Sequence, residues 1–186
     1  MSQKLTTYSI SQRWKNRFDE WVEDNRGATA VEFAFIAGPF FFMIFGLLEL
    51  SLVFIVSTTL EHGINEASRQ IRTGSLQTAN GTEAQFRGAV CSQLFGLLDC
   101  SNNLFIDVQV FDSFGAGNPG TAIDSNGDFD PSGFGFNPGQ RTDIVLIRAF
   151  YEWDLITPFV SQPLANLSNG NLLIQSGVAF RNEPFS

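Results

Sequence analysis

The sequence predicts an α+β protein in which a long N-terminal helix packs on a small antiparallel β-sheet, together with a second short helix. An apolar segment covers residues 28–56, helical spacing of apolar residues continues beyond it, and three segments with strand character follow. We expect three regions: a leader at residues 1–27, a transmembrane helix at 28–56 and one α+β domain at 57–186.

The apolar segment has the length of a membrane span. From Phe33 to Leu48 there are 16 consecutive residues without a charge. At 1.5 Å per residue, a helix from Val31 to Val56 is about 39 Å long, enough to cross a hydrocarbon core of about 30 Å. A buried core helix is the alternative, but phenylalanines on all faces leave little polar surface for water. A signal peptide would have a shorter apolar region of about 7 to 15 residues, followed by a small-residue cleavage pattern that is missing here.

Charges on the two sides of this segment predict its orientation. Residues 1–27 contain five basic and four acidic side chains, whereas residues 57–186 contain six basic and thirteen acidic ones. Because basic residues beside a span mark its cytoplasmic side, we expect a cytoplasmic leader and a periplasmic C-terminal domain.

Helical patterns continue beyond the apolar segment. Leu60, Ile64, Ala67 and Ile71 keep helical spacing, so we expect the first helix to continue as an amphipathic one to about Thr73 and to end at Gly74. Thr82 and Gln85 then form a capping-box pattern at the start of a second helix. The apolar stripe of that helix is Phe86, Val90, Leu94 and Leu97.

Three segments have strand character. Residues 106–110 alternate apolar residues with Asp107 and Gln109, which predicts a strand with one solvated face. Residues 144–151 begin apolar on both faces and suit a central strand, and residues 172–181 alternate again. Between the first two strands, residues 113–142 are rich in glycine and proline, so we expect a long irregular or disordered loop there.

Cys91 and Cys100 are the only cysteines. In an oxidising periplasm, a close pair predicts a structural disulfide that joins the second helix to the first strand. A redox pair would more often have C-x-x-C spacing, and two cysteines without partner histidines make a poor zinc site.

The loop carries acidic residues at alternate positions, as a calcium loop does. An EF-hand loop, however, requires glycine at its sixth position and glutamate at its twelfth, and here both are missing. We therefore expect a solvated acidic loop and no metal site. The residues in question are Asp124, Asn126, Asp128 and Asp130.

Two glutamates interrupt the apolar segment. Cleavage of the chain after Gly27 would make Ala28 the new N-terminus and leave an ammonium group about one helical turn from Glu32. Glu49 lies near the outer end of the span, where we favour a lipid-interface residue over a residue with a role in assembly. Pro39 removes one helical hydrogen bond and predicts a kink or local loosening, although transmembrane helices also tolerate proline.

The string GATAVEFAF at residues 27–35 resembles the processing site of type IV prepilins, and in particular that of TadE-type pseudopilins of tight-adherence (Flp) pilus systems. CSQLFGLLDC at 91–100 and RNEPF at 181–185 are also similar to TadE-type sequences. The N-terminal motif is the more specific of these similarities.

The resemblance implies an inner-membrane protein that a prepilin peptidase cuts between Gly27 and Ala28. It implies that Glu32 pairs with the N-terminal amine of an adjacent subunit and so sets the axial register during assembly. Expected partners are the peptidase, other pilins and pseudopilins, the pilus assembly platform and membrane lipid. Since Flp pilins are much smaller than this chain, the resemblance favours a minor component of pili that mediate surface adhesion.

Enzymatic and nucleic-acid functions are not indicated. The one histidine, His62, is far in sequence from any nucleophile motif, and neither a Walker loop nor an H-E-x-x-H motif is present. A net charge of −8 disfavours nucleic-acid binding, and we expect no cofactor. The alternative to a pseudopilin is an uncleaved single-pass inner-membrane protein whose periplasmic domain binds a partner or ligand.

Overall fold

The computed structural model describes residues 27–94, 96, 98–115, 119–157 and 162–185. The chain divides into two compact units, Met1–Ile44 and Phe45–Ser186. The expected α+β architecture is confirmed, with one long helix, further short helices and a three-stranded antiparallel sheet in the order β1-β2-β3. The elements are α2 (Ala28–Arg72), α3 (Ser75–Thr78), α4 (Glu83–Gln93), β1 (Leu104–Phe111), β2 (Ile144–Trp153), η2 (Gln162–Leu164) and β3 (Leu172–Arg181).

Helix α2 contains 45 residues and joins the apolar segment to the amphipathic one without a break. Pro39 lies inside it, and the α-helix continues on both sides of this residue. The helix ends where the sequence predicts, because Gly74 adopts a left-handed φ of 78° that other residues rarely adopt.

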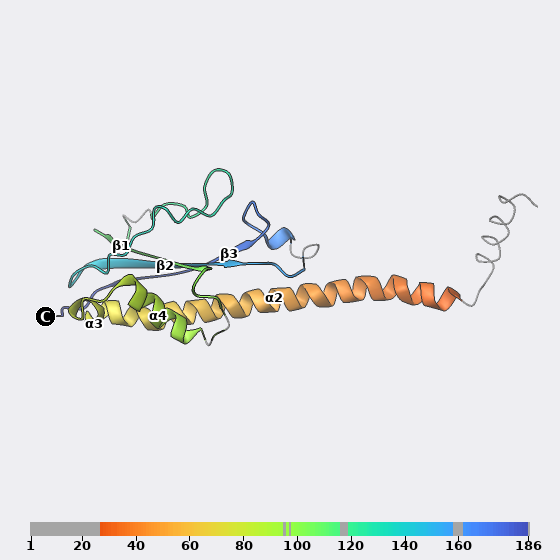
Figure 1. Ribbon diagram of the computed structural model, residues 1–186, viewed down its shortest axis with the longest axis horizontal. Coiled ribbons are helices and arrows are strands. Elements are labelled where there is room, and N and C mark those ends of the chain that lie inside the picture. Colours follow the sequence, from red (N-terminus) through yellow and green to blue (C-terminus); the bar gives the residue numbers. More distant parts are fainter. Residues whose placement is uncertain (1–26, 95, 97, 116–118, 158–161, 186) are drawn as a thin grey trace, which may run out of the picture. The chain divides into compact units, whose positions relative to one another are not determined.

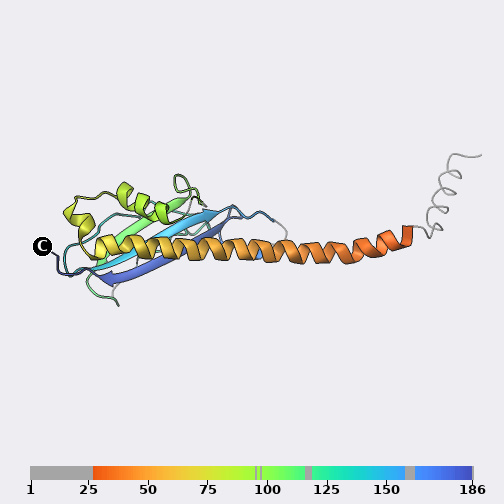
Figure 2. The same cartoon turned by 90° about the horizontal axis from the view of Figure 1, so that it is seen from below.

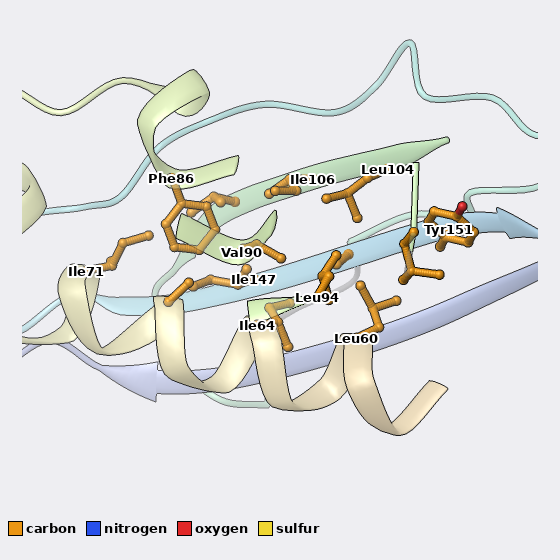
Figure 3. Packing of buried hydrophobic residues seen from close by; sticks show 14 of the residues in the cluster. Leu60, Ile64, Ile71, Phe86, Val90, Leu94, Leu104, Ile106, Ile147 and Tyr151 are labelled. Atoms are coloured by element: carbon orange, nitrogen blue, oxygen red, sulfur yellow. The ribbon is translucent and has the colours of Figure 1, made fainter. Parts of the chain in front are cut away.

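The second half of α2 forms the centre of the hydrophobic core. Figure 2 shows this part of α2 lying against the sheet with α4 beside it, and Figure 3 shows their side chains meeting. Each fully buried aliphatic side chain contributes about 1.5–3 kcal/mol, so the predicted stripe makes this half of the helix integral to the domain. The core residues from α2 are Val56, Leu60, Ile64, Ala67 and Ile71.

Helix α4 begins with the predicted capping box. The hydroxyl of Thr82 accepts from the backbone N–H of Gln85, and the side chain of Gln85 accepts from the backbone N–H of Thr82. Gly63 of α2 allows α4 to approach closely, since a Cβ there would lie 3.1 Å from Cδ2 of Leu94. The predicted stripe residues Phe86, Val90 and Leu94 are buried, and Leu97 lies outside the described residues.

The prediction of a solvated outer face on β1 is wrong. Asp107 is only 1% exposed and accepts two hydrogen bonds from the guanidinium of Arg148, at 3.0 and 2.7 Å. Arg148 also donates to the carbonyl oxygens of Pro119 and Gly120, and the backbone N–H of Gly135 donates to Asp107. The alternation in the sequence was real, but Asp107 is paired with Arg148 and with the loop instead of with water, and the side chain of Gln109 donates to Asp107.

The glycine- and proline-rich loop is therefore a second cover for the sheet. Its described part lies on the face opposite α2 and α4 (Figure 1), where Phe129 and Phe134 pack on Phe150 of β2. Residues 135–137 also hydrogen-bond to Val108 along the outer edge of β1. The expectation of a disordered loop does not hold for residues 119–142, because an ion pair and an aromatic cluster hold them in place.

The C-terminal residues close over the end of α2. The backbone N–H of Glu183 donates to the carbonyl oxygen of Arg72, and the two side chains form an ion pair at 3.4 Å. Phe185 covers Gly74 so closely that a Cβ on this glycine would lie 2.1 Å from the ring. The RNEPF segment thus ties the last strand to the end of the first helix.

Cys91 and Cys100 form a disulfide with their Cα atoms 6.1 Å apart. It joins α4 to the turn before β1, and both cysteines pack against the core. This bond covalently links α4 of the helical layer to the segment that leads into β1 of the sheet.

We expect Arg148→Met to lower the free energy of unfolding by about 3–5 kcal/mol, because it leaves the buried Asp107 carboxylate without its counter-charge. Chemical denaturation of the full chain in detergent micelles measures this change. Arg181→Met is the matched control, since Arg181 is exposed on β3 and should change the stability by less than about 0.5 kcal/mol. Equal effects of the two variants would contradict a role for the buried pair.

Replacing both Cys91 and Cys100 by alanine should cost about 2–3 kcal/mol, because the disulfide no longer restricts the unfolded chain over this short loop. The same denaturation experiment measures the loss. The parent protein under reducing conditions should show a similar decrease, and an unchanged midpoint in both samples would refute the stabilising role.

Candidate functional site on the N-terminal helix

The predicted cleavage site lies at the start of α2. Gly27 is exposed and directly precedes Ala28, the first residue of the helix. A Cβ at Gly27 would meet no atom within 4 Å, so the described structure leaves space around this residue. The leader residues 1–26, including the basic residues used to predict orientation, lie outside the described part of the chain.

Glu32 lies one helical turn after Ala28, at a rise of about 6 Å along the axis. Its side chain is exposed, and it forms no ion pair within the described residues. The carboxylate is thus directed outward from a helix surface that is otherwise apolar. A partner from another chain would have free access to it.

Much of α2 exposes large apolar side chains. One stretch, Thr29–Arg72, is long and apolar enough to cross a membrane by length and composition. The exposed residues continue past the middle of the helix, as far as Ile55. They are Val31, Phe33, Phe35, Ile36, Phe40, Phe41, Phe42, Met43, Phe45, Leu47, Leu48, Leu50, Leu52, Phe54 and Ile55.

Glu49 differs from the sequence-based interpretation of a lipid-interface residue. It is only 2% exposed, and its carboxylate accepts hydrogen bonds from the last residue of β2 and from residues that follow it. The donors are the backbone N–H of Ile156 at 3.2 Å, the backbone N–H and hydroxyl of Thr157 at 3.0 Å each, and Nε1 of Trp153 at 3.4 Å. Glu49 is therefore an intramolecular hydrogen-bond acceptor, and its carboxylate does not extend toward headgroups.

The sequence indicates that Glu49 needs a hydrogen-bond partner, but it does not identify that partner. A carboxylate in an apolar helix requires hydrogen-bond donors, which predicts that some partner exists. Three of the four donors, however, come from backbone N–H groups and an indole more than one hundred positions away. Backbone donors carry no sequence signature, so the partner could not be identified from the pattern.

The acidic loop binds its own backbone. The backbone N–H groups of Asp128 and Asn126 donate to the carboxylate of Asp124, and these bonds lower its pKa from the usual value. Ser168 donates to Asp128. Among the described residues, no three His, Cys, Asp or Glu side chains converge to hold a metal ion. His62 is an exposed residue of α2.

One known protein family matches the part of the chain that carries these features. The family model described as TadE-like protein matches residues 27–69. The match begins at Gly27 and ends three residues before the end of α2. The match does not extend to the disulfide or to the C-terminal RNEPF segment. Searches of curated proteins and of solved structures found no significant match.

Proposed function

The chain carries a TadE-like region at residues 27–69, which associates it with the tight-adherence (Flp) pilus system, and we propose that it acts as a minor pilin (pseudopilin) of this system. In this proposal, a prepilin peptidase removes residues 1–27 and the mature chain assists in the assembly or initiation of pili. The observation that carries it is the position of the match, which begins at the proposed cleavage residue Gly27.

The two surfaces of α2 support this function. Its exposed apolar side chains suit lipid before assembly and the helices of other subunits afterwards. Its buried stripe from Val56 to Ile71 holds the helix to a folded domain. In this proposal, α2 anchors the protein in the inner membrane with the domain on the periplasmic side. During assembly, the same apolar surface contacts other pilins.

Glu32 supplies specificity in this arrangement. An α-amino group has an ordinary pKa of about 7.7 to 8.0 and is largely protonated at neutral pH. The ammonium group of a processed neighbouring subunit would pair with the exposed carboxylate of Glu32. An unpaired acidic side chain within lipid is unfavourable, so pairing with the ammonium group favours one axial register over others.

Processing is tested by the intact mass of the protein purified from its native membrane. We expect a chain that begins at Ala28 when the prepilin peptidase is present. Gly27→Val should block the cut, because its branched side chain adds bulk at a position where the protease must hold the extended backbone close to its catalytic groups. Gly38→Val, at a position inside α2 where a Cβ also has space, should be processed normally. An intact N-terminus in the parent protein would exclude the pseudopilin and favour an uncleaved envelope protein.

The pairing role is tested by Glu32→Gln, which keeps the shape of the side chain and removes its charge. We expect normal membrane insertion and normal cleavage but at least about a tenfold decrease in piliation, since 1.4 kcal/mol corresponds to a factor of ten. Glu61→Gln is the control, because Glu61 is exposed on the same helix beyond the apolar surface. Electron microscopy and immunoblotting of sheared pili measure the outcome, and full piliation of Glu32→Gln would remove this role.

A further inference from the structure

The segment Asp154–Thr157, which we call the strap, directly follows β2 and is tied to α2 through Glu49. Both oxygens of the Glu49 carboxylate take part, since Ile156 N–H lies 3.2 Å from each and Thr157 donates to one of them twice. Strap and glutamate belong to the same compact unit. The contact thus fixes the level along α2 that the strap reaches.

The outward surface of α2 at this level is suited to lipid. Leu47, Leu48, Leu50 and Phe54 are exposed around Glu49, and Glu49 is the one charged residue between Phe33 and Leu60. No charge from Glu49 reaches this surface, because its carboxylate is turned inward to the strap. The surface is therefore continuous with the apolar surface of the candidate span.

Hydroxyl groups on this part of α2 are also satisfied within the helix. The hydroxyl of Ser51 donates to the carbonyl oxygen of Leu47 at 2.7 Å, and that of Thr58 donates to the carbonyl oxygen of Phe54 at 2.9 Å. Side chains that bond back to their own helix need no water. These two hydroxyl groups are thus compatible with lipid at and beyond the level where the strap meets α2.

The strap itself carries an exposed apolar side chain and an exposed charged side chain two residues apart. Ile156 is 63% exposed, although its backbone N–H is bound to Glu49. Asp154 is exposed as well and accepts a hydrogen bond from Asn171. An exposed isoleucine next to an exposed carboxylate suits the boundary between acyl chains and headgroups, where one enters lipid and the other remains hydrated.

We propose that the strap is a second membrane contact of this protein: Ile156 inserts into the interface of the outer leaflet, and the strap shields the Glu49 carboxylate from lipid. The proposal takes the membrane span of α2 as given and goes beyond it, because it places part of the folded domain in the bilayer. The four donors around Glu49 provide the hydrogen bonds that lipid cannot. The domain is then held at a fixed height and orientation on the membrane before assembly.

Lipid exposure of single labelled positions tests this proposal. An environment-sensitive fluorophore is attached to Ile156→Cys in the full chain, with the native disulfide kept oxidised, in vesicles that contain nitroxide-labelled phospholipid. We expect strong quenching by lipid labelled near the headgroup and weaker quenching by lipid labelled deep in the acyl chain. Phe114→Cys is the matched control, because Phe114 is also 63% exposed but lies in the loop after β1.

A third position separates this proposal from the function on which it rests. Phe40→Cys, in the middle of the candidate span, should be quenched most by the deep label. Quenching at Phe40 but not at Ile156 would overturn the strap proposal and leave the membrane span intact. Loss of quenching at both positions would overturn the span and the strap together.

The role of Glu49 is tested in the same assay. Glu49→Ala removes the acceptor of the strap, so we expect the label at Ile156 to lose its quenching while the label at Phe40 keeps it. Ser51→Ala, which removes a hydroxyl bonded only to α2 itself, should leave both signals unchanged. Unaltered quenching at Ile156 in the Glu49→Ala variant would show that the carboxylate does not hold the strap at the membrane.

Discussion

The fold depends on the burial of one stripe of α2 against the sheet. Leu60, Ile64 and Ile71 are fully buried and meet α4 on one side and the strands on the other. A three-stranded sheet alone exposes too much apolar surface to be stable. The amphipathic half of α2 likewise depends on tertiary packing for its helical stability in water. Each layer is therefore completed by the other, and the disulfide, the capping box and the C-terminal segment secure the ends of this contact.

The opposite face of the sheet is organised by a buried ion pair as well as by an aromatic cluster. Asp107 and Arg148 face each other across β1 and β2 and use their remaining hydrogen-bonding capacity on backbone groups of the loop. Burial of such a pair is costly unless these extra bonds are made. The loop is thus needed by the ion pair as much as the ion pair is needed by the loop, which explains why a segment rich in glycine and proline is ordered on this face.

Local patterns were sufficient to predict α2, α4, the three strands and the end of α2 at Gly74, because periodicity, capping residues and backbone preference act over a few positions. The short helices α3 and η2 were not predicted. The contacts of Asp107 and Glu49 were not predictable in the same way. In both cases a polar residue in an apolar setting indicated that a partner exists, but the partner was a distant arginine with backbone carbonyls, or backbone amides and an indole. Gly27 and Glu32 are exposed, and the roles that the prepilin resemblance implies for them stay predictions, because those roles depend on other molecules.

Glu49 gives α2 a boundary that hydropathy alone does not show. By composition, the apolar segment continues to Val56, yet the domain already contacts the helix at Glu49, about two turns earlier. Between these levels the helix has two environments at once: one side is bound to the strap at Glu49 and packs on the core at Val53 and Val56, and the other side exposes Leu50, Phe54 and Ile55. In the proposed function as a pseudopilin, such an overlap is useful, because the apolar side can exchange lipid for a neighbouring subunit without breaking the internal bonds of the glutamate.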